Sequence, residues 1–247
     1  MLTYRNLVSC PDNIFSYEVL YKETHLFIKS PKDYSSKLLR ILTHIRKPLE
    51  NYIKKYPEFL YSLKPYEPSK DAPKIVKMMC EVSKEVGIGP MSAVAGAIAE
   101  ILGEELLKII RKEKQQEFLI IENGGDIFAY FDKPITVGLY SGKNSPFSGK
   151  VSVKISYINK PVGICTSSGS IGHSLSFGRA DSVTIISESC SFADSCATFI
   201  CNMVKTEADI EKAVNLAKEF KKVMFVCITM NKKIAFWSRN DKIEVVM

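Results

Sequence analysis

The sequence predicts an α+β fold in which a mixed β-sheet is covered by packed helices. Segments with helical and with strand periodicity both occur, but they do not alternate strictly as in a doubly wound fold. The 247 residues are enough for one large domain or two small ones. With 46% hydrophobic and 25% charged residues, the composition is typical of a globular protein, and no apolar run approaches the roughly 18–20 residues of a membrane helix.

The N-terminal third is expected to contain two strands and a long helix. Residues 15–21 and 25–29 have the composition of short strands separated by a turn. Apolar residues then recur at helical spacing over residues 33–55, which predicts an amphipathic helix that Pro48 should kink or interrupt. Three prolines within residues 64–73 indicate a connector.

Two further helices follow this connector, over residues 74–86 and 92–112, with a break at Gly-Ile-Gly-Pro between them. The second helix begins with small apolar residues on all sides, which allow close approach of another element or of a ligand. We expect residues 1–70 to pack on a core formed by residues 71–247, as one compact unit.

Strand patterns dominate the chain from residue 118 onward. The expected strands are residues 118–121, 127–131, 135–139, 151–157, 183–187, 223–229 and 234–237. Two helices, over residues 192–204 and 207–220, interrupt this series.

The formal net charge is +7, and residues 1–75 contribute 13 Lys and Arg against 8 Asp and Glu. Because apolar residues in this segment follow helical spacing, the charge indicates a solvated helix face, and no nucleic-acid partner is expected. Seven cysteines without a Cys-x-x-Cys motif argue against a disulfide scaffold and against zinc. The first residues lack an apolar export signal, so we expect a cytoplasmic location and no membrane partner.

The first candidate site is the glycine-rich entry to the helix at residues 92–112, where Gly89, Met91 and Ser92 could face a ligand. Free N–H groups at a helix start can bind an anion. The sequence matches neither a Walker A motif nor GxGxxG, and tight packing between helices explains the small residues equally well.

The second candidate is Asn123, Gly124, Gly125 and Asp126, after a predicted strand. Asn-Gly-Gly can form the turn of a simple β-hairpin. The acidic residues that flank the turn, Glu122 and Asp126, favour a ligand at this strand end.

The third candidate is a hydroxyl-rich segment, Thr166, Ser167, Ser168 and Gly169, expected to be a loop that surrounds an anionic group. His173 follows it and could transfer a proton near neutral pH, although a structural histidine is the commoner case.

The fourth candidate pairs Asp194 with Thr198, four residues apart on one helix face. A carboxylate and a hydroxyl on one face form half of an oxygen shell for Mg²⁺. The alternative is an Asp that caps its own helix and a Thr that bonds back to it.

Taken in order, these motifs resemble the ApbE family of FAD:protein FMN transferases. The resemblance rests on the glycine-rich helix start, Asn-Gly-Gly-Asp-Ile at 123–127, Thr-Ser-Ser-Gly at 166–169, Ser-Val-Thr-Ile at 182–185 and Ala-Asp-Ser-Cys-Ala-Thr at 193–198. It covers roughly residues 87–204. The segment at 89–100 is similar to an uncharacterised ApbE-like branch of archaea and anaerobic bacteria, and that similarity covers most of the chain.

The resemblance implies an α+β domain that binds FAD with Mg²⁺. Asp194 and Thr198 match the family's metal ligands, and a backbone carbonyl near Ser92 would add a third. Residues 123–126 and 166–169 match the segments that line the dinucleotide. The family's reaction cleaves the FAD pyrophosphate, joins FMN to a Thr or Ser hydroxyl of a partner protein and releases AMP.

Two departures from the family pattern bear on this activity. One histidine stands where the transferases have a pair, and residues 174–181 lack their Asp-Pro-x-Thr-Gly motif. The lipoprotein signal is also missing. The pattern favours retained binding of a flavin or adenine nucleotide over retained transfer, and it leaves a protein acceptor and a homodimer open.

A different hypothesis is a role in sulfur or thiol metabolism. Cys165, Cys190, Cys196 and Cys201 cluster along the serine-rich segment. A thiolate of low pKa among them could act as a nucleophile, while the alternative is that these cysteines are small buried hydrophobic residues.

Overall fold

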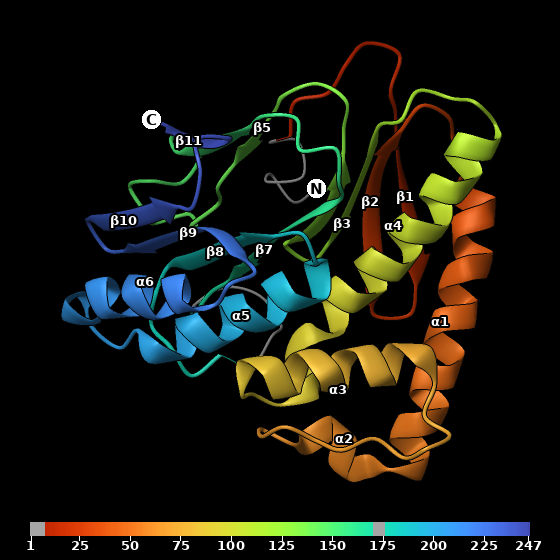
Figure 1. Cartoon of the computed structure of the whole chain (residues 1–247), viewed down its shortest axis with the longest axis horizontal. Helices are drawn as coiled ribbons and strands as arrows, with labels where there is room; N and C mark the ends of the chain where they lie inside the picture. Colours follow the sequence, from red (N-terminus) through yellow and green to blue (C-terminus); the bar gives the residue numbers. More distant parts are fainter. Residues whose placement is uncertain (1–7, 170–175) are drawn as a thin grey trace.

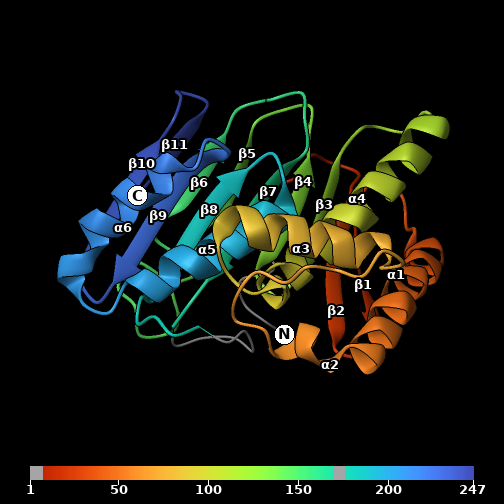
Figure 2. The same cartoon turned by 60° about the horizontal axis from the view of Figure 1, so that its bottom comes forward.

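The computed structural model describes residues 8–169 and 176–247. Its elements form three layers: a layer of helices, an eight-stranded sheet and a three-stranded sheet (Figure 1). Figure 2 shows the helical layer lying across one face of the large sheet. The α+β class predicted from the sequence is confirmed.

The large sheet has the strand order β1-β2-β3-β4-β7-β8-β9-β10. Its strands are Phe15–Tyr21 (β1), Thr24–Ser30 (β2), Leu119–Asn123 (β3), Asp126–Tyr130 (β4), Val162–Ser167 (β7), Ser182–Ser187 (β8), Val223–Met230 (β9) and Lys233–Ser238 (β10). All pairings among the described strands are antiparallel, unlike the expected mixed sheet. The reason is that the helices between β2 and β3 join antiparallel neighbours and form no β-α-β crossover.

The small sheet has the order β11-β6-β5 and covers the face of the large sheet opposite the helices. Its strands are Ile135–Gly138 (β5), Ser152–Ile155 (β6) and Ile243–Val246 (β11). A buried apolar cluster fills the space between the sheets, with Ile120 and Phe225 from the large sheet and Val137 and Val153 from the small one. Burial of these side chains holds the two sheets together.

The helical layer covers the larger core. The α-helices are Ser35–Lys55 (α1), Pro57–Tyr61 (α2), Lys74–Val86 (α3), Val94–Lys112 (α4), Cys190–Met203 (α5) and Ile210–Glu219 (α6), with 3₁₀ turns at Pro90–Ala93 (η2) and Glu207–Asp209 (η3). Gly103 lets α4 approach the sheet closely, because a Cβ there would lie 2.2 Å from the Phe128 ring. The helical layer therefore sits directly on β3, β4, β7 and β8.

Four elements differ from the sequence predictions. α1 continues through Pro48, which lies on the exposed side of the helix, so the carbonyl that loses its helical partner faces water. Strands β7 and β11 and the short helix α2 were not predicted. The sequence did not predict β7 because its residues Gly163, Thr166 and Ser167 are typical of a loop.

No helix among the described residues is by itself long and apolar enough to span a membrane. The pair formed by Lys74–Val86 and Pro90–Lys112 meets that test jointly by length and composition, but it is bent by 107°.

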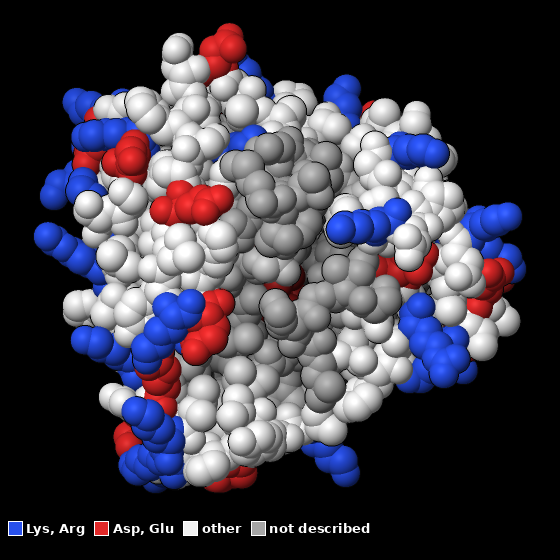
Figure 3. Space-filling model, turned by 180° about the vertical axis from the view of Figure 1, so that it is seen from behind, with Lys and Arg blue, Asp and Glu red and all other residues white. Residues whose placement is uncertain are grey.

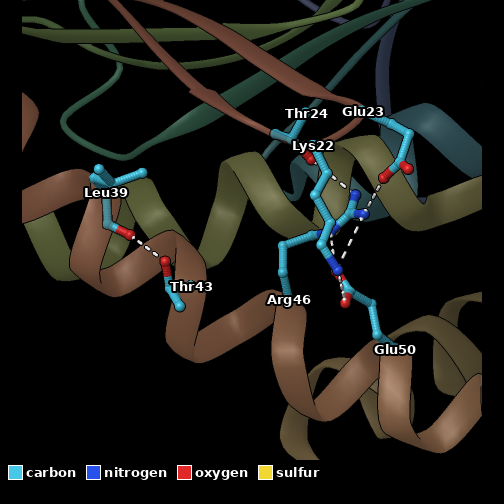
Figure 4. A network of polar contacts seen from close by, with 7 residues as sticks. All are labelled: Lys22, Glu23, Thr24, Leu39, Thr43, Arg46 and Glu50. Carbon is cyan, nitrogen blue, oxygen red and sulfur yellow. Dashed lines mark hydrogen bonds and ion pairs between the residues drawn. The ribbon is translucent and has the colours of Figure 1, made fainter.

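A polar network fixes the β1–β2 hairpin to α1 (Figure 4). The Arg46 guanidinium donates to Thr24 Oγ1 at 2.8 Å, to Glu23 Oε2 at 2.5 Å and to Glu50 Oε1 at 3.4 Å. Lys22 also pairs with Glu50. The Arg46 side chain is only 13% exposed, so its contacts are partly shielded from water and contribute more than a typical surface ion pair.

Replacing Arg46 should therefore destabilise the protein. We expect Arg46→Met to lower the free energy of unfolding by about 1–2 kcal/mol, because it removes hydrogen bonds to charged and hydroxyl groups while keeping most of the aliphatic chain. Urea unfolding measures the change, with Arg40→Met on the exposed face of α1 as the matched control. Equal stability of the two variants would show that the network does not hold the hairpin.

Candidate functional site

The β3–β4 hairpin carries the second candidate segment. Gly124 and Gly125 form its two-residue turn with φ of +68° and +108°, and Asn123 pairs with Asp126 across the strands. This is the simple hairpin that the sequence allowed. Asn123 and Asp126 are nevertheless buried, and Asn123 Nδ2 donates to the Ala95 carbonyl at 3.0 Å. The hairpin end is thus fixed against the start of α4.

The glycines near the start of α4 serve packing between elements. A Cβ on Gly89 would lie 1.9 Å from the Ser62 carbonyl oxygen, and one on Gly96 would lie 2.5 Å from the Cys190 carbonyl oxygen. Gly89 therefore faces the end of α2, while Gly96 faces α5. Ser92, between them, bonds through its hydroxyl to the Ser195 hydroxyl at 2.8 Å.

The third candidate segment is not the expected loop throughout. Thr166 and Ser167 belong to β7, and the Thr166 hydroxyl bonds to the Thr184 hydroxyl at 2.8 Å. Gly125 lies next to this strand end, since a Cβ on it would be 3.6 Å from the Thr166 carbonyl oxygen. Gly169 packs against Gly178, and His173 lies outside the described residues.

Asp194 is buried in α5 and contacts the start of α4. Its Oδ2 accepts the Gly96 backbone N–H at 2.8 Å. The sequence alternative of an Asp capping its own helix is therefore wrong: Asp194 satisfies an amide at the N-terminus of a different helix, where a negative charge is favourable. Thr198 is buried one turn further along α5.

Two buried carboxyl groups, Asp126 and Asp194, interact at the junction of α4, the β3–β4 hairpin and α5. Burial raises the pKa of Asp194 to about 7, even though the amides of Gly96 and Ala95 lower it. Burial also raises the pKa of Asp126 well above its usual range, and the negative charges of Asp194 and Glu122 raise it further. The junction is thus a region of negative potential that a proton or a cation would relieve. Seen from behind, a few acidic atoms are visible near the middle of that face (Figure 3).

The structure brings together only part of the predicted set. Ser92, Asn123, Asp126 and Asp194 meet where α4 begins, with the end of β7 beside the hairpin. Met91 is half-buried against the large core. Gly89 and Gly169 instead pack against the backbone of Ser62 and of Gly178, respectively.

The donor chemistry of this junction fits Mg²⁺ shared with a phosphate. Its side chains offer carboxylate and hydroxyl oxygens, which Mg²⁺ prefers. Over residues 8–169 and 176–247, no three His, Cys, Asp or Glu side chains are placed to hold a metal ion among themselves. Mg²⁺ commonly takes only one or two protein carboxylates and completes its shell with water and substrate phosphates, so a site for this ion does not require such a cluster.

A model of the family described as AbpE bacteria matches residues 7–222. The chain belongs to this family. It is 41% identical over 222 residues to a UPF0280 protein of Methanococcus vannielii, which covers 87% of each chain. A UPF0280 protein of Methanocaldococcus jannaschii is 38% identical over 226 residues and covers 89% of each. These relatives place this AbpE-family protein in the archaeal-type branch of the ApbE-like superfamily.

Solved ApbE structures share the fold. The apo form of the flavinyl transferase ApbE of Pseudomonas stutzeri superposes with a TM-score of 0.57 over 91% of this chain and 94% of that chain. The ApbE protein of Thermotoga maritima gives 0.58 over 91% and 96%. Both are 12% identical to this AbpE-family protein, so the likeness concerns the fold.

Two further acidic residues lie near the junction: Glu122, which the sequence analysis named as a flank of the turn, and Glu100, which it did not name. Glu122 is 4% exposed and its Oε1 accepts the Gly125 N–H at 2.8 Å. Glu100 reaches from α4 to the start of α5. The position of Glu100 one turn after Gly96 was visible in the sequence, but no local pattern links it to residue 191.

The four cysteines of the sulfur-handling hypothesis do not resemble reactive thiolates. Cys165 and Cys190 have their sulfur atoms 3.6 Å apart and are fully buried. Burial raises the pKa of the Cys165 thiol well above its usual range and that of Cys190 to about 11. It raises those of Cys196 and Cys201 as well. These environments favour the neutral thiol and argue against the sulfur-handling hypothesis.

Thiol labelling checks this conclusion. In native protein we expect a thiol reagent to modify the exposed Cys10 rapidly and the six buried cysteines only after unfolding. Mass spectrometry of the labelled peptides identifies the sites. Rapid native labelling of Cys165 or Cys196 would restore the thiolate hypothesis.

The buried carboxyl pair predicts a pH-dependent stability. Between the ordinary Asp pKa of 3.8 and about 7, the folded protein keeps on Asp194 a proton that the unfolded chain has released. The associated stability is therefore full below pH 4 and is lost as the pH rises through 7. The pKa of Asp126 is raised as well, so Asp126 adds to this loss of stability.

The double variant Asp126→Asn/Asp194→Asn should gain stability relative to the wild type as the pH increases from 5 to 8, by about 1–3 kcal/mol. Urea unfolding at both pH values, without added metal, measures the difference, and the exposed Asp132→Asn is the control. A stability difference that does not change with pH would contradict the raised pKa values of Asp126 and Asp194.

Proposed function

We propose that this protein binds FAD or a related flavin or adenine nucleotide together with Mg²⁺ at the junction of α4, the β3–β4 hairpin and α5. The observation that carries the proposal is the buried pair Asp126 and Asp194 at the N-terminus of α4, in a chain with the ApbE fold. Burying two carboxylates that repel one another costs free energy unless a proton or a cation compensates their charge.

In this proposal Asp194 and Thr198 hold the Mg²⁺ ion, together with a backbone carbonyl near Ser92. Bound Mg²⁺ would neutralise negative charge on the phosphates. Residues 123–126 and 166–169 would line the nucleotide, because the hairpin and the end of β7 lie side by side next to the metal ligands. Met91 and Gly89 would contribute at the edge through the backbone of η2.

We further propose flavin-transfer chemistry for the same site. Its class is cleavage of the FAD pyrophosphate, transfer of FMN to a hydroxyl of a protein acceptor and release of AMP, with His173 as the proton-transfer group. The fold shared with proteins named flavinyl transferase supports this step. The altered segment at 174–181 makes nucleotide binding the part to test first, in a protein that we expect to act in the cytoplasm.

Thermal unfolding with added FAD and Mg²⁺ tests the binding proposal. At a ligand concentration about 100 times Kd, binding to the folded state alone adds about 2.7 kcal/mol, which for a domain of this size raises Tm by about 5–10 °C. Asp194→Asn should remove the Mg²⁺-dependent part of the shift, whereas the exposed Asp132→Asn should keep it.

Other nucleotides serve as the comparison. FMN, ADP and AMP should give smaller shifts than FAD, because each offers only part of the dinucleotide. No shift with any flavin or adenine nucleotide, with or without Mg²⁺, would refute the proposal.

A further inference from the structure

The start of α5 is capped by a side chain from another helix. Glu100, half-buried on α4, accepts the Ser191 backbone N–H at 2.7 Å through Oε2. The same oxygen accepts the hydroxyls of Ser191 at 2.9 Å and Ser189 at 3.0 Å. Ser189 is the N-cap of α5 and itself accepts the Phe192 N–H. One carboxylate oxygen thus organises the first turn of α5.

The opposite contact runs from α5 to α4. Asp194 on α5 accepts the Gly96 N–H at the start of α4, as described above. Gly96 and Glu100 are four residues apart, and Ser191 and Asp194 are three apart, so each helix presents a donor and a carboxylate on one face. We call these two contacts the reciprocal clamp: Glu100 to Ser191 and Asp194 to Gly96. Each carboxylate lies at the positive end of the partner helix.

Close backbone approach makes the clamp possible. A Cβ on Gly96 would lie 2.5 Å from the Cys190 carbonyl oxygen, and one on Gly163 of β7 would lie 2.3 Å from the Cys190 Cα. The first residue of α5 is therefore wedged between α4 and β7. Small shifts of this turn would be transmitted along the helix to Asp194, which lies one turn further on.

We propose that Glu100 is a positioning residue for the candidate site. By fixing the first turn of α5, it sets where Asp194 and Thr198 stand relative to the start of α4 and to the β3–β4 hairpin. The consequence for ligand binding rests on the function proposed above, but the mechanical coupling of the two contacts does not. A Glu100 that only stabilised α5 would leave the Asp194–Gly96 contact unchanged when removed.

Hydrogen exchange of the Gly96 amide tests the coupling directly. In Glu100→Ala we expect Gly96 to exchange at least about ten-fold faster relative to Ile185, a buried β8 amide that reports global unfolding. Glu100→Gln, whose side-chain oxygen can still accept the Ser191 N–H, should stay within about three-fold of the wild type. Glu105→Ala, on the exposed side of α4, is the matched control and should not change the ratio.

An unchanged Gly96 to Ile185 ratio in Glu100→Ala would overturn the proposal. Should that variant fail to fold, Ser191→Ala supplies the same comparison, because it removes one of the three donors to Glu100 and should accelerate Gly96 by about three-fold. No acceleration in Ser191→Ala would then count against the coupling.

Binding of FAD with Mg²⁺, measured by calorimetry on folded variants, tests the functional consequence. Glu100→Ala should weaken binding at least about ten-fold, Glu100→Gln by less than about three-fold and Glu105→Ala not at all. Tight binding by Glu100→Ala would show that Glu100 does not position the site. If the wild type itself binds no FAD, the proposed function fails, and the exchange experiment alone decides the role of Glu100.

Discussion

The Asp194 carboxylate at the start of α4 is the contact on which the surrounding structure depends. A buried carboxylate is costly unless donors compensate it, and the first amides of a helix supply both hydrogen bonds and a favourable dipole. To reach them, α5 must lie close to α4 and β7, and glycines at 96 and 163 permit that approach. Asn123 then fixes the hairpin to the same turn of α4.

This arrangement concentrates negative charge at one place in the interior. Asp126 lies opposite Cys165 on β7 and within electrostatic reach of Asp194, so the charge of Asp194 raises the cost of ionising Asp126. The protein retains both groups although a hydrophobic pair would be cheaper to bury. The burial of both groups is the physical reason to propose a charged ligand at the junction.

The sequence was most informative where local periodicity determines structure. α3 and β1 begin and end at the predicted residues, since their apolar positions follow helical and alternating spacing without glycine or proline. β7 could not be recognised from the sequence, because its small and hydroxyl side chains are as common in a loop as in a buried strand. The shared face of Asp194 and Thr198 followed from helix geometry.

Contacts between distant segments were beyond local reasoning. Asp194 and Gly96 are 98 residues apart, and Glu100 and Ser191 are 91 apart, so no spacing rule connects them. The same holds for Gly89, whose neighbour Ser62 ends the short helix α2, an element that the sequence did not predict. Small residues at the start of a helix indicate that another group approaches its backbone closely. Only the fold determines whether that group is protein backbone or a ligand.

The most direct test of the central claim is a crystal structure grown with FAD and Mn²⁺, in which anomalous scattering locates the ion. The expected result is a manganese peak at the Asp194 carboxylate and the Thr198 hydroxyl, beside the nucleotide phosphates. A bound nucleotide with manganese elsewhere, or with no ion beside Asp194, would contradict it.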